Sequence, residues 1–233
     1  MEYNCYGQPI GPSLKESCFR ELNATIIEGN TCDLIRASES HAHVFYTDIF
    51  KKGLTPPDWT YLFFSSFPSE EAFADIFNKT FLSDDPYFFG IWNKEHSKVL
   101  GTLALMRNDR QNGVIEVGYV IYSQQLKKSI QATEAQYLLA KYVFENLGYR
   151  RYEWKCDSLN EPSKLAAKRL GFEYEGTFRQ AIIYKNRNRD TSWFSMLDCE
   201  WERNKKRLEK WLSPDNFDQD GKQLLSLNNL NRI

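Results

Sequence analysis

Side chains that could bind an anion are concentrated in one short segment, residues 123–135, which reads SQQLKKSIQATEA. Lys127 and Lys128 supply positive charge. The hydroxyl groups of Ser129 and Thr133 can donate hydrogen bonds. A helix that begins here would add unpaired backbone N–H groups and the positive end of its dipole, a combination that suits a diphosphate. The same residues also fit an ordinary loop that is capped by Thr133 and carries solvated lysines, so the segment alone leaves both interpretations open.

The hydrophobic pattern predicts that this segment joins a strand to a helix. Apolar residues recur at helical spacing over 133–147, after which Gly148 can adopt the left-handed conformation that ends a helix. A second helix is predicted over 161–170, with Asn160 as its N-cap and Gly171 at its end. The order of elements favours an α/β (α+β) fold in which a mixed sheet carries helices on its faces. The other expected elements are strands at 87–92, 98–107, 113–122, 150–156, 172–185 and 190–197, and helices at 39–50, from Ser69 onward and at 199–212.

Composition favours one domain with a short extension. With 233 residues, of which 42% are hydrophobic, the chain can bury a sizeable single core. We therefore expect one domain over 1–212, with an extended N-terminal segment, followed by a polar C-terminal tail over 213–233. A formal net charge of only -1 does not indicate a surface that binds nucleic acid. The oligomeric state stays open.

Cysteine usage and hydropathy predict a cytoplasmic protein. The five cysteines are odd in number and lack a C-x-x-C pair, which is unlike a disulfide framework or a zinc site. The N-terminus lacks the basic and apolar stretches of a signal peptide. No apolar run approaches the ~20 residues that a membrane helix needs. His41, His43 and His96 have no partners at metal-binding spacing, so no metal ion is expected.

Four stretches of the sequence carry a family resemblance. They read ATEA at 132–135, YVFENLGYRRYEWKCDSLNEPS at 142–163, AAKRLGFEYEGTFRQ at 166–180 and RNRDTSWFSMLDCEW at 187–201. Together they resemble the GNAT superfamily of acetyltransferases, and in particular its Rim-type branch, the ribosomal-protein N-terminal acetyltransferases. The resemblance covers about 87–201 of the chain.

The resemblance implies a mostly antiparallel sheet that splays apart between the strands at 113–122 and 150–156. Acetyl-CoA, the acyl donor, would enter this gap, with its pantetheine along the strand backbone and its pyrophosphate over the helix start. The usual family loop, R-x-x-G-x-A, has a glycine that allows close approach to phosphate, whereas this chain has Ile130 there. The expected cofactor-binding residues are Val120, Ile121, Tyr122, Lys127, Lys128, Ser129, Gln131, Ala132, Thr133, Asn160 and Ser163.

The implied reaction transfers an acetyl group to an amine, either a protein N-terminus or a small molecule. The amine must lose a proton before it attacks, and Glu116 is the candidate base, unless strand alternation turns it to solvent. Ser163 is the candidate acid for the departing thiolate, although a serine in the first turn of a helix can also be structural. The position of a glutamate that is proposed as the base in Rim-type enzymes falls near Ile182 here. The complete Rim-type mechanism therefore cannot be carried over to this chain.

Two further hypotheses stay open. The missing loop glycine and the missing Rim-type glutamate would fit a weakly catalytic acyl-CoA-binding protein. An interaction module that keeps the fold is the other alternative. The aromatic loop, residues 59–67, could line the acceptor site or fill the core, and Cys156 is expected to be buried rather than nucleophilic.

Overall fold

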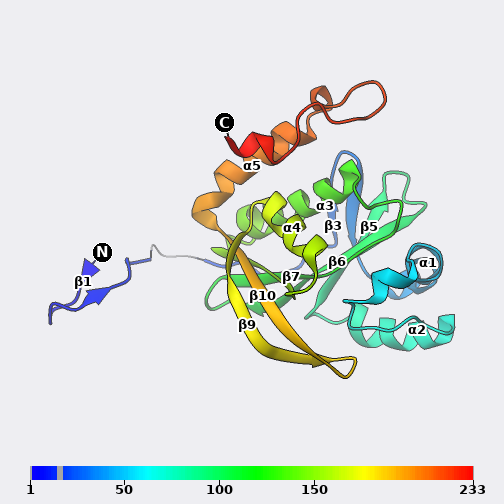
Figure 1. Ribbon diagram of the computed structural model, residues 1–233, viewed down its shortest axis with the longest axis horizontal. Coiled ribbons are helices and arrows are strands. Elements are labelled where there is room, and N and C mark those ends of the chain that lie inside the picture. Colours follow the sequence, from blue (N-terminus) through cyan, green and yellow to red (C-terminus); the bar gives the residue numbers. More distant parts are fainter. Residues whose placement is uncertain (1, 15–17, 233) are drawn as a thin grey trace.

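An eight-stranded sheet forms the centre of the protein in the computed structural model, which describes residues 2–14 and 18–232. Its strand order is β3-β4-β5-β6-β7-β8-β10-β9, and all neighbours are antiparallel except β7 and β8, which are parallel. This mixed, mostly antiparallel sheet with flanking helices confirms the predicted fold class (Figure 1). The strands are β3 (Ile26–Glu28), β4 (Cys32–Arg36), β5 (Tyr87–Asn93), β6 (Val99–Asp109), β7 (Val114–Tyr122), β8 (Arg151–Asp157), β9 (Glu173–Tyr184) and β10 (Arg187–Leu197).

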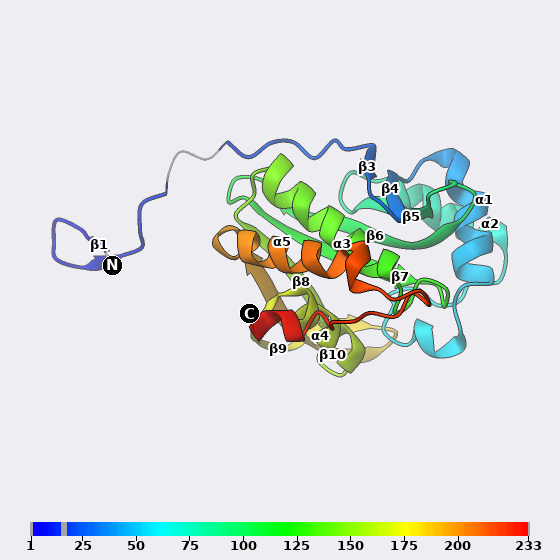
Figure 2. The ribbon, with the colours of Figure 1, turned by 90° about the horizontal axis from the view of Figure 1, so that it is seen from above.

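Helices cover the sheet and give the protein two hydrophobic cores. Side chains alternate along the strands, so that Phe88 of β5 belongs to the smaller core and Phe89 to the larger one. The larger core contains residues of α3, α4 and α5, whereas the smaller one contains residues of α1 and α2. Figure 2 shows α3 and α5 running together across the sheet, apart from α1 and α2. The helices are α1 (Ala42–Phe45), α2 (Glu70–Ile76), α3 (Ile130–Lys141), α4 (Glu161–Leu170) and α5 (Asp198–Leu212).

Predicted caps set the boundaries of two helices. At the start of α4, Asn160 Oδ1 accepts the backbone N–H of Ser163 at 3.3 Å, and Gly171 ends the helix with a φ of 104°. At the start of α2, Ser69 Oγ accepts the N–H of Ala72 at 3.3 Å. In both cases the side-chain oxygen replaces a hydrogen bond that the first turn of a helix cannot make internally.

The predicted start of the central helix at 133 was wrong. α3 begins three residues earlier, at Ile130, because Ser129 rather than Thr133 is its N-cap. Ser129 Oγ accepts the N–H of Ala132 at 3.1 Å. Beyond α3 the chain continues through a π-helical turn over Tyr142–Asn146. The helical segment therefore extends close to its predicted end, but its last part is π-helical rather than α-helical.

The hairpin of β3 and β4 was not predicted, and a residue of α3 holds its turn. The carboxylate of Glu134 is buried and accepts the N–H groups of Asn30 and Thr31, each at 2.7 Å, and that of Cys32 at 3.2 Å. The glutamate of the ATEA stretch therefore joins the central helix to the edge of the sheet.

The residues after α5 fold back onto the domain instead of extending from it. Leu227 and Leu230 are buried in the larger core. Trp211 Nε1 donates to Gln223 Oε1 at 2.9 Å, and Arg207 donates to the carbonyl oxygen of Leu227 at 3.4 Å. Ile233, the last residue of the expected tail, lies outside the described residues. At the other end of the chain, β1 (Glu2–Tyr3) and β2 (Pro9–Ile10) pair with each other in a separate hairpin.

Among the described residues, no helix combines the length and the apolar character that crossing a bilayer requires.

Candidate active site

The parallel strands β7 and β8 separate partway along their length. They pair only between residues 114–117 and 151–154. Beyond this point β7 stays paired with β6, and β8 stays paired with β10. The separation coincides with a bulge at Tyr119, which has a φ of 47°. We call the opening the fork; it leaves one backbone edge of β7 facing a cavity of ≈ 1750 Å³.

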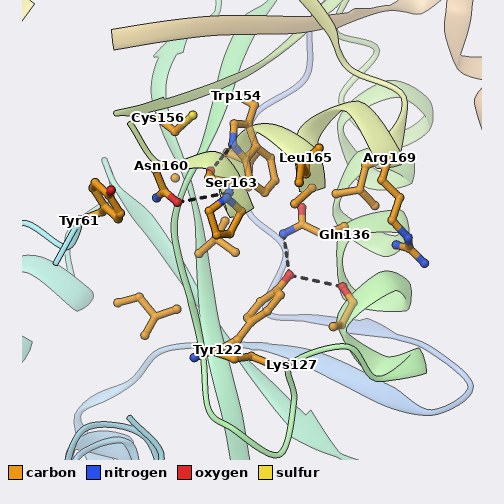
Figure 3. A pocket seen from close by; sticks show the side chains of 18 of the residues that line it. Tyr61, Tyr122, Lys127, Gln136, Trp154, Cys156, Asn160, Ser163, Leu165 and Arg169 are labelled. Carbon is orange, nitrogen blue, oxygen red and sulfur yellow. Dashed lines mark hydrogen bonds between the residues drawn. The ribbon is translucent and has the colours of Figure 1, made fainter. Parts of the chain in front are cut away.

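The cavity has walls on both faces of the sheet. Successive residues of β8 point to opposite faces, and residues on each face line the cavity. Trp154 points toward α4, where its Nε1 donates to Ser163 Oγ at 3.0 Å (Figure 3). Lys155 points to the other face, where its Nζ lies 2.9 Å from Glu116 Oε2. We call the part of the cavity next to α3 and α4 the helix side, and the part next to the aromatic loop the aromatic side.

The start of α3 presents backbone donors to the helix side. The first N–H groups of a helix have no partner within it, and Ser129 Oγ serves only one of them. The Ser129 hydroxyl itself donates to the carbonyl oxygen of Leu126 at 2.7 Å, so its proton is already used. Lys128, just before the helix, has an exposed side chain and a left-handed φ of 61°. The helix start thus fits an anion, but through backbone N–H groups more than through hydroxyl groups.

Lys127 is held in an ion pair rather than presented freely to the cavity. Its Nζ pairs with the carboxylate of Asp58, which also accepts from Gln124 Nε2 at 2.6 Å. Burial alone would raise the pKa of Asp58, but hydrogen bonds from Lys127 and Thr55 outweigh burial and lower that pKa. The loop before α3 therefore carries less uncompensated positive charge than the sequence predicted.

Arg169 supplies a cation here that the sequence did not single out. Its Nη1 donates to Thr133 Oγ1 at 3.1 Å, and its guanidinium lies 4.9 Å from the ring centroid of Trp211. Burial lowers the pKa of Arg169. It forms no ion pair with the carboxylates of the described residues. Sequence alone does not distinguish Arg169 from its exposed neighbour Lys168, because only the packing of α4 brings Arg169 to the start of α3.

Glu116 lies on the aromatic side, where β7 and β8 still pair. Its Oε2 is 2.9 Å from Lys155 Nζ and 3.3 Å from Arg107 Nε. Glu116 is only 6% exposed, and burial raises its pKa while Lys155 opposes the rise. The sequence left open whether this residue faces solvent, and the structure turns it to the cavity wall.

Ser163 and Asn160 lie together on the helix side. Asn160 is occupied as the cap of α4, and Ser163 Oγ accepts the indole N–H of Trp154. The hydroxyl of Ser163 therefore keeps its own proton for another acceptor. Cys156, on the same wall, is buried, and this burial raises the pKa of its thiol, as expected for a cysteine that is not a nucleophile.

The aromatic loop contributes both to the cavity wall and to the core. Phe63 and Phe64 line the cavity, and the ring of Phe64 stacks on that of Tyr119 with 5.7 Å between centroids. Phe67 instead packs edge-on against Phe50 in the smaller core, 5.3 Å between centroids. The core therefore supports the loop, while the loop forms a wall of the site.

All of the site residues predicted from the sequence meet at this one cavity. Ile130, in the place of the family glycine, is half-buried on the same wall. No cluster of three or more potential metal ligands occurs in the described part of the chain. The predicted residues on the cavity wall are Glu116, Val120, Ile121, Tyr122, Lys127, Lys128, Ser129, Gln131, Ala132, Thr133, Asn160 and Ser163.

Sequence comparison finds acetyltransferases among the relatives of this chain. The profile of the acetyltransferase (GNAT) domain matches residues 34–173. The uncharacterized N-acetyltransferase p20 of Bacillus licheniformis is 34% identical over 113 residues, which are 48% of this chain and 63% of that protein. YdaF of Bacillus subtilis, whose name proposes a ribosomal N-acetyltransferase, is 28% identical over 155 residues, which are 61% of this chain and 79% of that protein. The match to YdaF confirms the resemblance to the Rim-type branch.

Comparison with solved structures extends the match to nearly the whole chain. A GCN5-related N-acetyltransferase from Brucella melitensis is 39% identical, covers 94% of this chain and 99% of its own, and gives a TM-score of 0.87. A GNAT-family structure from Chromobacterium violaceum is 36% identical, covers 84% of this chain and 99% of its own, and gives a TM-score of 0.72. The fold, the fork and these matches agree. The chain therefore belongs to the GNAT acetyltransferase family.

Proposed function

We propose that this protein transfers the acetyl group of acetyl-CoA to an amine, either a protein N-terminus or a small molecule. The fork between β7 and β8 is the observation that supports this proposal. The pantetheine arm would run along residues 120–122, as an added strand would, and the pyrophosphate would lie at the start of α3. Three of the five free cysteines are exposed, which suits a reducing compartment, so we also propose a cytoplasmic location.

The proposed chemistry is a direct attack on the thioester. An amine that arrives as its ammonium form gives one proton to Glu116, directly or through water, and its lone pair then attacks the acetyl carbon. A new N–C bond forms, and a backbone N–H near Ile121 stabilises the oxyanion by about 3 kcal/mol. The C–S bond then breaks. The sulfur leaves as a thiol with a proton from Ser163, which regains one from the attacking nitrogen.

Thiol release tests this proposal directly. The protein is incubated with acetyl-CoA and a panel of amines that includes peptides with free N-termini, and free CoA thiol is followed over time. We expect release that depends on the amine and saturates with it, together with an acetylated product in the mass spectrum. Saturable CoA binding without thiol release on any acceptor would contradict the proposal.

A second candidate function, acyl-CoA binding with little transfer, has specific support in the helix side. Asp58 neutralises Lys127, and Ile130 occupies the place where a glycine would let the backbone approach phosphate. The same assay separates the two candidates, because a binding protein would retain acetyl-CoA without amine-dependent release of thiol.

Arg169 gives a prediction about CoA affinity. We expect Arg169→Gln to weaken CoA binding about 10-fold, because a charge-assisted hydrogen bond contributes roughly 1.5–3 kcal/mol and no described carboxylate already pairs with this guanidinium. Isothermal titration with CoA measures the change. Lys168→Gln, one residue earlier and exposed, is the matched control and should leave the affinity unchanged. Equal affinities of the two variants would remove Arg169 from the phosphate site.

A further inference from the structure

We propose that the acceptor amine carries a carboxylate, and that Arg189 binds this carboxylate on the aromatic side of the cavity. The inference rests on the acetyl transfer proposed above and names the class of its acceptor. It assigns to Arg189 a role in binding and orientation, and the carboxylate takes no part in the bond changes of the transfer.

Arg189 is a buried cation without an anionic partner in the described structure. It is only 6% exposed, its Nε has no hydrogen-bond partner among the described residues, and it belongs to none of their ion pairs. Its guanidinium lies 5.4 Å from the ring centroid of Phe63 and 6.0 Å from that of Tyr184. These rings lie within cation–π distance of the guanidinium but do not neutralise its charge. A charge removed from water is costly unless an ion or a hydrogen-bonding group compensates it, and Arg189 lines the cavity.

Two neighbours of Arg189 on β10 also have buried polar atoms without hydrogen-bond partners among the described residues. Arg189, Thr191 and Trp193 alternate along the strand and all line the cavity. Each has a buried polar atom without a partner in the described structure, namely Arg189 Nε, Thr191 Oγ1 and Trp193 Nε1. Buried polar atoms in native proteins are nearly always hydrogen-bonded, so this row is a place where the described residues leave hydrogen bonds unmade. Arg189 Nε and Trp193 Nε1 can only donate, and Thr191 Oγ1 can donate or accept, so a ligand bound along the row would supply acceptor oxygens.

The acidic groups on this side have other partners. Glu116 pairs with Lys155 and Arg107, whereas Asp157 accepts the hydroxyl of Tyr184 at 2.7 Å and the backbone N–H of Leu159 at 2.9 Å. No carboxylate of the described residues lies within ion-pair distance of Arg189. A second ammonium group on the acceptor, as in a polyamine, would meet this charge and be repelled. A carboxylate would instead pair with the planar guanidinium in two parallel hydrogen bonds.

Matched acceptor pairs test the inference. β-Alanine is compared with its amide, which represents small acceptors, and a tetrapeptide with aspartate in second place is compared with its asparagine counterpart, which represents peptides. We expect at least one acidic member to have a KM about 10-fold or more below that of its neutral counterpart, and the pair that shows the difference identifies the source of the carboxylate. Equal KM values within both pairs would overturn the proposal.

Variants at the same position separate binding from a merely structural role. Arg189→Gln should raise the KM of the acidic acceptor about 10-fold or more, leave that of its neutral counterpart within about twofold, and leave the CoA dissociation constant unchanged. Arg189→Lys keeps the positive charge but cannot form two parallel hydrogen bonds with a carboxylate. Its KM for the acidic acceptor should therefore lie between those of the unmodified protein and of Arg189→Gln. Arg203→Gln, an exposed arginine on α5 that does not line the cavity, is the control for loss of a positive charge. An equal loss on both members of a pair would contradict the assignment.

Calorimetry keeps this inference separate from the proposed function. Titration of the acidic and neutral acceptors into the CoA-bound protein measures binding without requiring turnover. If the acidic member binds more tightly and Arg189→Gln abolishes this difference, the assignment of Arg189 is supported, whether or not thiol is released. Absence of thiol release would reject only the proposed acetyl transfer. Equal binding of both members would reject the assignment even if amines are acetylated.

Discussion

Replacing Glu116 by Gln is expected to lower turnover about 100-fold or more, since a positioned general base contributes roughly 10²–10⁴-fold to a rate. The amide keeps the shape of the carboxylate but cannot take a proton from the ammonium form of the acceptor. Steady-state thiol release with a fixed amine measures the loss. CoA affinity should stay unchanged, because Glu116 lies on the aromatic side and the proposed CoA contacts lie on the helix side.

Glu153 offers a close control for this experiment. It is also buried, and its Oε2 lies 2.7 Å from the same Lys155 Nζ, but it does not line the cavity. Glu153→Gln should therefore leave turnover within a few-fold of the unmodified protein. If both variants lost activity alike, the effect would belong to the position of Lys155, and Glu116 would not be the base.

The pH dependence of the reaction gives the same assignment a second measurement. A base must be ionised to accept a proton, and burial raises the pKa of Glu116 above its ordinary value. We therefore expect kcat/KM to fall as the pH drops through this raised pKa, at a higher pH than an exposed glutamate would produce. Glu116→Gln should abolish this acidic limb, and a limb that persisted in the variant would have to come from another group.

Replacing Glu134 by Ala is expected to reduce the free energy of unfolding by about 3 kcal/mol, because three backbone N–H groups would lose a charged acceptor. The corresponding fall in Tm is roughly 6–12 °C for a chain of this size. Urea unfolding followed by circular dichroism measures the first quantity and calorimetry the second. The β3–β4 hairpin should loosen first, since Glu134 is its link to α3.

Glu202 is the control for the stability prediction. It lies on the exposed face of α5 and pairs with Lys206 across one turn, a contact of the kind that contributes little. Glu202→Ala should change the free energy of unfolding by no more than about 0.5 kcal/mol. A similarly small change for Glu134→Ala would show that the hairpin does not depend on this carboxylate.

Local signals in the sequence were sufficient for elements whose boundaries depend on nearby residues. The helix over 161–170 was predicted at its observed limits, because Asn160 and Gly171 set its two ends through contacts within a few residues. The start of α3 was misplaced because Ser129 and Thr133 are both good caps and only the packed loop decides between them. β3 and β4 were missed because they are short, and what stabilises their turn, Glu134, comes from a distant part of the chain.

The site shows the same division between local and distant information. The residues of the loop and of the helix starts were found because they occupy recognisable sequence stretches, and the structure gathers them at one cavity. Arg169 and Arg189 were not found, because an arginine in a helix or on a strand is ordinary until its surroundings are known. Asp58 was also missed, although it is the partner that decides how much charge Lys127 can offer.

The folded-back segment after α5 affects how the protein is made. Ser226 and Asn228 line the cavity, and Arg207 donates to the carbonyl oxygens of both Leu227 and Arg169. A chain still attached to the ribosome can fold its sheet before these residues emerge from the exit tunnel, since domains fold progressively during synthesis. The helix side of its cavity would still lack a wall, so a nascent chain should acquire full affinity for CoA only after this segment has left the tunnel and packed against α5.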